Sequence, residues 1–96
     1  MVKQNATTNP RRGEESLRDL LHALKSGDRQ TARAKARSLQ PLDLALHIVL
    51  TAKTAVSAEE IVDRVVYGIS PAYRRRLVEQ VREMLLAARD AQQAVT

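Results

Sequence analysis

The chain has 96 residues, which is enough for one small domain and too few for a catalytic domain with a separate regulatory one. It contains no cysteine, and this excludes disulfides, thiolate metal ligands and cysteine nucleophiles. Sixteen Lys and Arg against eleven Asp and Glu give a net charge of +5. A basic balance favours polyanionic partners, of which nucleic acid is the commonest.

The first thirteen residues, MVKQNATTNPRRG, are polar and include a proline and a glycine, so residues 1–13 are predicted to form a flexible tail. They contain no apolar stretch that would serve as a secretory signal. The longest apolar run, residues 44–50, is interrupted by His47 and is much shorter than the roughly 20 residues of a membrane span. We therefore expect a cytoplasmic protein that does not enter the membrane.

The N-terminal half predicts a helical hairpin. Leucines recur with the spacing of one helix face over residues 14–26, and Gly27 and Asp28 supply a stop and the next N-cap. The following helix, over residues 29–39, has an alanine-rich face that permits close approach to the first helix. Its outer side is expected to carry four cations, Arg29, Arg33, Lys35 and Arg37.

The C-terminal half predicts three more helices. The first begins at Pro41 and is apolar all round, so it is expected at the centre of the domain. The second opens with the capping box of Ser57 and Glu60 and is expected to end at Gly68. The third has Ser70 as its cap and runs to about residue 93.

The predicted fold is an all-α bundle of four to five helices. It combines an N-terminal αα-hairpin with a helix-turn-helix-like core of three helices, within a single domain over residues 14–93 and a frayed end at 94–96. The last helix is longer than a domain of this size needs, and Leu86 lies off its apolar stripe. Its distal part, from Arg89 onward, is expected either to fray or to pack on another chain, and a homodimer is one possibility.

Residues 57–86 resemble the helix-turn-helix family. The shared features are Gly68 in the turn, Ile69 after it and Leu77 in the second helix. Arg64 and Arg74 fall where the common pattern has a small and a β-branched residue, so a shifted register or a longer turn is required. The segments EEIVDRVVYG and RRRLVEQVREMLLAA also resemble a variant found in regulators of conjugative-element transfer. That family contains DNA-binding activators and antiactivators that bind an activator.

The resemblance implies a DNA-binding helix that starts at Ser70. Arginine suits phosphate clamping and bidentate contact with guanine. Cations at a helix N-terminus are unfavourable, because they face the positive end of the helix dipole. Departures from such local preferences tend to occur at functional sites. The alternative is a solubilising helix start in which Arg75 pairs with Glu79. The candidate nucleic-acid-binding residues are Arg29, Arg33, Lys35, Arg37, Lys53, Arg64, Ser70, Tyr73, Arg74, Arg75 and Arg76.

Nothing in the sequence predicts an enzyme. The only histidines, His22 and His47, fall on different helices without metal-ligand spacing, and there is no glycine-rich phosphate loop. No cofactor or metal is expected, and the basic helix over residues 29–39 lacks the Trp or Phe anchors of a membrane-surface helix.

Two functional hypotheses remain. The first is a small, non-enzymatic, transcription-associated regulator that binds double-stranded DNA. The second is an antiactivator or adaptor that binds a partner protein such as a transcriptional activator.

Overall fold

A computed structural model describes the backbone of residues 8–95 and the side chains of residues 15–93. This part of the chain forms five α-helices and no strand, which confirms the predicted all-α fold with a long C-terminal helix. The helices are α1 (Thr8–Lys25), α2 (Arg29–Ala36), α3 (Leu42–Thr51), α4 (Ala58–Val65) and α5 (Pro71–Val95).

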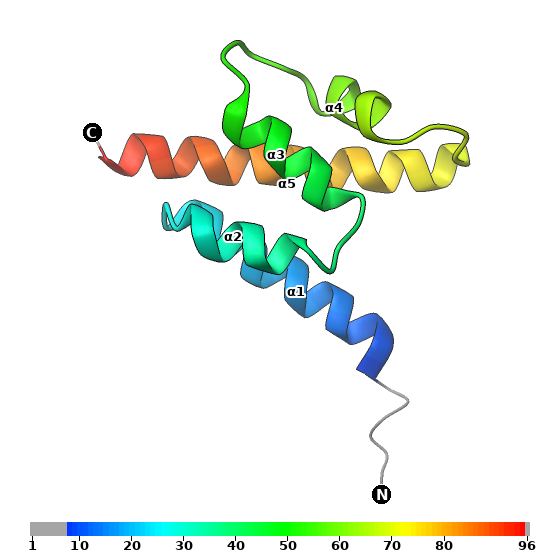
Figure 1. Ribbon diagram of the computed structural model, residues 1–96, viewed down its shortest axis with the longest axis horizontal. Helices are drawn as coiled ribbons and strands as arrows, with labels where there is room; N and C mark the ends of the chain where they lie inside the picture. Colours follow the sequence, from blue (N-terminus) through cyan, green and yellow to red (C-terminus); the bar gives the residue numbers. More distant parts are fainter. Residues whose placement is uncertain (1–7, 96) are drawn as a thin grey trace, which may run out of the picture.

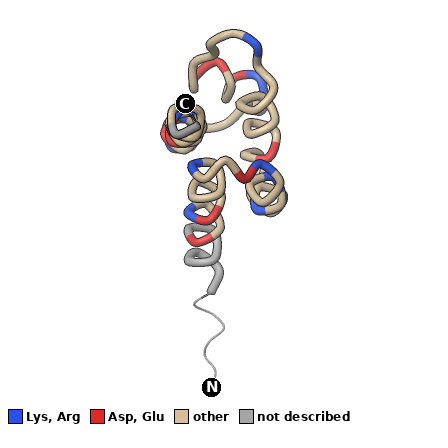
Figure 2. Tube along the Cα trace, turned by 90° about the vertical axis from the view of Figure 1, so that its left-hand side faces the viewer, with Lys and Arg blue, Asp and Glu red and all other residues tan. Residues whose placement is uncertain are grey.

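The helices are arranged in two layers. Helices α1 and α5 form one layer, α2 and α3 form the other, and α4 packs against both α3 and α5 (Figures 1 and 2). The molecule measures 49 × 34 × 16 Å along its principal axes. Its shortest dimension is about the thickness of two packed helices, because helix axes pack roughly 8–10 Å apart. Such a thin slab buries one side of most helices and leaves two broad faces open to water.

The hydrophobic core lies along α5, which contacts α1, α3 and α4. Its buried stripe follows the spacing of one helix face, as the sequence predicted, and the opposing helices contribute small and aliphatic side chains. The largest fully buried side chains are Leu20, Leu46, Ile61, Val62, Val81 and Met84. No charged or polar side chain is buried in the described part of the chain.

Helix α3 is not the centre of the domain, and that prediction was wrong. It buries Leu42, Ala45 and Leu46, whereas Leu44 remains 54% exposed. The reason is the layer arrangement: α3 lies in an outer layer and is covered only on the side that faces α2, α4 and α5. A slab of this thickness leaves an all-round apolar helix partly exposed.

The first helix begins six residues before the predicted Glu14. Residues 8–13, expected in the flexible tail, form the first turns of α1, and the remaining predicted tail lies outside the described residues. Pro10 falls at the third helical position, where the backbone amide has no partner within the helix, so its missing N–H removes no hydrogen bond. Gly13 costs a helix only about 1 kcal/mol, too little to terminate it.

The predicted N-caps are confirmed. Ser57 Oγ accepts a hydrogen bond from the Glu60 amide at 3.1 Å, and Ser70 Oγ accepts one from the Tyr73 amide at 3.1 Å. Asp28 caps α2 by accepting from the amide and the hydroxyl of Thr31 at 3.1 and 2.6 Å. These bonds hold the pKa of Asp28 below its ordinary value, with the bond from the Thr31 hydroxyl as the larger cause.

Several helix ends differ from the prediction. Helix α2 ends at Ala36 rather than 39, and its C-cap Arg37 still has helical backbone angles. Pro41 itself is the N-cap of α3, so this helix begins at Leu42, one position later than predicted. Helix α4 ends at Val65, three residues before Gly68, because Val66 already has extended backbone angles. Gly68, with a φ of 64°, belongs instead to the turn that leads into α5.

The distal part of α5 packs on its own chain. The helix continues to Val95, and Thr96 lies outside the described residues. Ala88, Ala91 and Gln92 face the ends of α1 and α3 around a hollow that Leu24 also lines. The extra length of α5 is therefore used to support the other helices of the same molecule.

Candidate nucleic-acid interface

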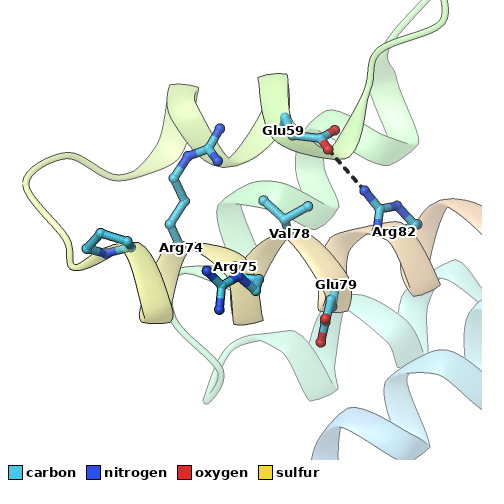
Figure 3. A pocket seen from close by; sticks show the side chains of 7 residues that line it. Glu59, Arg74, Arg75, Val78, Glu79 and Arg82 are labelled. Carbon is cyan, nitrogen blue, oxygen red and sulfur yellow. Dashed lines mark hydrogen bonds and ion pairs between the residues drawn. The ribbon is translucent and has the colours of Figure 1, made fainter.

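Helices α4 and α5 lie side by side and antiparallel. Glu59, near the start of α4, accepts a hydrogen bond from Nη2 of Arg82 at 3.0 Å (Figure 3). Asp63, near the end of α4, meets Arg74 in the first turn of α5. The two helices are joined by the five-residue turn 66–70. Helix α4 thus runs along the first three turns of α5 instead of crossing them.

Arg74 is held by a two-pronged ion pair. Its Nε donates to Oδ1 of Asp63 at 3.0 Å and its Nη2 donates to Oδ2 at 3.1 Å. The hydrogen bond from Arg74 lowers the pKa of Asp63, and the same bond raises the pKa of Arg74. The geometry matches the flat fork of a guanidinium to both oxygens of a carboxylate. Arg74 therefore turns its guanidinium group toward α4, although its side chain stays 40% exposed.

Arg75 and Arg76 are exposed and have no acidic partner among the described residues. The alternative pairing of Arg75 with Glu79 is not formed, and Figure 3 shows the two side chains pointing apart. The three consecutive arginines are therefore not equivalent: one is part of the α4–α5 contact, and two remain open to water.

A hollow of about 330 Å³ lies between α4 and α5. Its lining is mixed in charge, since Arg74, Arg75 and Arg82 are accompanied by Glu59 and Glu79. Two of these three cations already have acidic partners. The hollow therefore offers an anion one free guanidinium, which is a weak site for a phosphate.

The other candidate residues of this region have local roles. Ser70 uses its hydroxyl oxygen to cap α5. Tyr73, a candidate nucleic-acid-binding residue, is 37% exposed. Tyr67, which sequence reasoning did not select, is 86% exposed in the turn before α5. The signal that could have found it is an aromatic residue next to a turn glycine, where little can cover it.

Of the remaining candidate cations, some form an ion pair with an acidic residue and one does not. Arg64 lies 3.6 Å from Glu60 of its own helix, and Lys35 lies 3.7 Å from Asp19 of α1. Lys53, in the loop between α3 and α4, is exposed and has no acidic partner among the described residues. Glu60 thus pairs with the next turn of α4, and among the described contacts it is Ser57 that provides the α4 cap.

The arginine row of α2 consists of Arg29, Arg33 and the C-cap residue Arg37, and it follows the seam between α2 and α3. Arg33 and Arg37 line a hollow of about 220 Å³ together with His47 and Asp43 of α3. Arg29 lies at the other end of the seam, beside the end of α3. The row is exposed, but it borders the buried alanines of α2 and does not lie directly opposite them.

None of the three arginines in this row has an acidic partner among the described residues. Asp43 is the one acidic residue that lines the 220 Å³ hollow, and its carboxylate accepts a hydrogen bond from the Leu44 amide at 2.8 Å. Successive arginines are one turn apart, so their Cα atoms advance along the helix by about 6 Å per step. The seam therefore carries a row of three guanidinium groups without an acidic partner among the described residues.

The arginine row of α2 and the arginines at the start of α5 do not form one surface. Among the described helices, α2 contacts only α1 and α3, and it touches neither α4 nor α5. Along the tube in Figure 2, basic and acidic positions alternate over the same helices. The structure thus separates the candidate residues into the α2 row, the free pair Arg75 and Arg76, and isolated cations that mostly belong to ion pairs.

Within the described residues, no three side chains of the kinds that hold metal ions come together. His22 and His47 are both exposed, one in each layer. No described helix combines the length and the apolar character needed to cross a bilayer. The chain matches no family model, no curated protein and no solved structure.

Proposed function

We propose that this chain is a small, non-enzymatic, transcription-associated regulator that binds the backbone of duplex DNA along the seam between α2 and α3. The observation that carries the proposal is the arginine row of α2, which has three exposed guanidinium groups without an acidic partner among the described residues. The net charge of +5 adds long-range attraction to a polyanion.

The chemistry of the seam suits phosphate. A guanidinium group donates two parallel hydrogen bonds to phosphate oxygens, and it stays charged at any physiological pH. Arg33 and Arg37 reach the same hollow from α2, and His47 supplies a further nitrogen from α3. Contacts of this kind with the phosphates of the DNA backbone position a protein on the duplex without reading the base sequence. Arg75 and Arg76 lie on another part of the molecule and are secondary in this proposal.

The test is a fluorescence anisotropy titration of the full chain with a labelled random duplex at several salt concentrations. Each phosphate that a cation neutralises releases counterions, and it contributes about −0.9 to the slope of log K against log salt. For the triple variant Arg29→Gln/Arg33→Gln/Arg37→Gln, we expect affinity to fall at least about tenfold at low salt and the slope to become less steep by up to about 2.7.

A matched control removes the same number of charges from cations that form ion pairs. The variant Lys35→Gln/Arg64→Gln/Arg82→Gln has the same net charge of +2 as the row variant. It should keep most of the wild-type salt slope. Equal losses in both variants would show that only overall charge matters, and wild-type protein that does not bind duplex at low salt would disprove the proposal.

A second candidate function is the adaptor that binds a partner protein. It is favoured by the pairing of Arg74 with Asp63, which engages one of the three helix-tip arginines in hydrogen bonds within the chain. In this case the duplex titration should show no salt-dependent binding, and the arginine row should be replaceable without effect on that measurement.

A further inference from the structure

The outer face of the α1–α5 layer contains an apolar groove. Its volume is about 460 Å³, and its lining residues come from α1 and α5 alone. Leu21 of α1 and Leu86 of α5 lie along it, together with the buried Ala87. Leu86 is 51% exposed, in a chain where most large aliphatic side chains of the described part are at least half-buried.

The two walls of the groove have opposite charge. The α1 wall carries Arg18 and Lys25, and the α5 wall carries Glu83 and Asp90. Lys25 and Asp90 approach to 4.0 Å at one end, where both side chains remain more than half exposed. His22 also lines the α1 wall.

The charge pattern repeats on the two helices with the same spacing. On each helix a charged residue is followed by a leucine three positions later and by a second charged residue seven positions later, which places all three on one face. The helices run in the same general direction (Figure 1). The basic wall and the acidic wall are therefore in register along the groove.

This register makes the face complementary to itself. A two-fold rotation about an axis along the groove would place α1 of a second copy over α5 of the first. The basic wall of each copy would then meet the acidic wall of the other, and the leucines would meet between the walls. Half a turn about an axis across the groove would instead place like charges on like charges. Closed two-fold dimers use one patch of each subunit in this self-complementary way.

We propose that the α1–α5 groove is a homodimer interface in which the basic wall of each copy contacts the acidic wall of the other. The apolar strip supplies the affinity, because exposed rim ion pairs are worth little by themselves. The charged walls fix the orientation, since the alternative orientation juxtaposes like charges. The arginine row of α2 lies in the other layer and stays accessible in such a dimer.

The first test measures the oligomeric state of the full chain by sedimentation equilibrium over a concentration series. We expect a reversible dimer whose dissociation constant rises about tenfold for each leucine lost, hence about a hundredfold for Leu86→Ser. Leu44→Ser is the matched control, because Leu44 is equally exposed on α3 but lies outside the groove. Wild-type protein that is monomeric at the highest attainable concentration overturns the proposal, as does equal weakening by both substitutions.

The second test reverses the charges of one wall at a time. Its outcome does not depend on the stability of the Leu86→Ser variant. Arg18→Glu/Lys25→Glu makes both walls acidic, and Glu83→Lys/Asp90→Lys makes both basic. Each variant alone should be monomeric, and an equimolar mixture should form a one-to-one heterodimer in native mass spectrometry. Their net charges are +1 and +9, so overall attraction does not explain association. A mixture that stays monomeric, or variants that still form homodimers, would contradict the proposed interface.

Discussion

Arg74 and Asp63 join the start of α5 to the end of α4 through two parallel hydrogen bonds of 3.0 and 3.1 Å. With the contact between Arg82 and Glu59, they hold α4 alongside α5 at both of its ends. The pairing separates Arg74 from its neighbours in sequence, because Arg75 and Arg76 remain open to water.

The first prediction concerns pH. The pKa of Asp63 is lowered in the folded state, so its pair with Arg74 stabilises the fold above the unfolded-state pKa of about 4. This stabilisation is lost as the pH falls through the lowered folded-state value. In urea titrations, Asp63→Asn should be less stable than wild type at neutral pH and should approach wild type at acidic pH. A difference that stays constant down to strongly acid pH would contradict this.

The second prediction separates the three arginines. Arg74→Gln should lower the urea midpoint, because it removes both hydrogen bonds to Asp63, whereas Arg76→Gln should leave the midpoint nearly unchanged. A double-mutant cycle of Arg74→Gln with Asp63→Asn should give a favourable coupling energy, since the two residues share one interaction. Equal effects at positions 74 and 76 would show that the pair contributes nothing in solution.

The third prediction concerns the helix caps. Ser57→Ala should destabilise the fold by about 1 kcal/mol, because the Glu60 amide loses its acceptor. For a domain of this size the loss corresponds to a fall in Tm of about 4–8 °C. Ser57→Asp is the control, because aspartate also accepts the amide hydrogen and favours the positive end of the helix dipole. Loss of stability in the Asp variant as large as in the Ala variant would argue against the cap.

The fourth prediction concerns the core. Met84 is fully buried on α5, so Met84→Ala should lower the unfolding free energy by about 2–5 kcal/mol through lost burial and the cavity left behind. Leu44→Ala removes a side chain that is 54% exposed and should cost clearly less. Urea unfolding of the two variants side by side gives the comparison, and similar losses would mean that α3 is covered in solution.

The fifth prediction concerns Gly68, whose φ is 64° and whose Cβ position has open space around it. Gly68→Ala should cost about 1–2 kcal/mol from backbone strain alone, without a steric clash. Gly68→Asn should cost less, because asparagine tolerates this conformation better. Chemical denaturation measures both values, and an alanine variant as stable as wild type would show that the turn has adopted another conformation.

The features that the sequence predicted correctly are local ones. The caps at Ser57 and Ser70 depend on residues three positions apart, and the buried stripe of α5 repeats with the helix period. The start of α1 was predicted wrongly, because a proline in its first turn was interpreted as part of a tail. In the candidate site, the sequence identified the α2 row and the arginines of α5 as cations, but not which of them are paired.

The amino-acid sequence by itself determined the helical class, the caps and the basic charge, because each depends on composition or on neighbours within a few residues. Only the tertiary structure decided that Arg74 is bound while Arg75 is free, that Leu44 is exposed, and that the two charged walls of the α1–α5 groove are in register. These properties arise where segments distant in the chain meet. The contacts that set them are made when the helices pack into two layers, and no short stretch of sequence contains both partners.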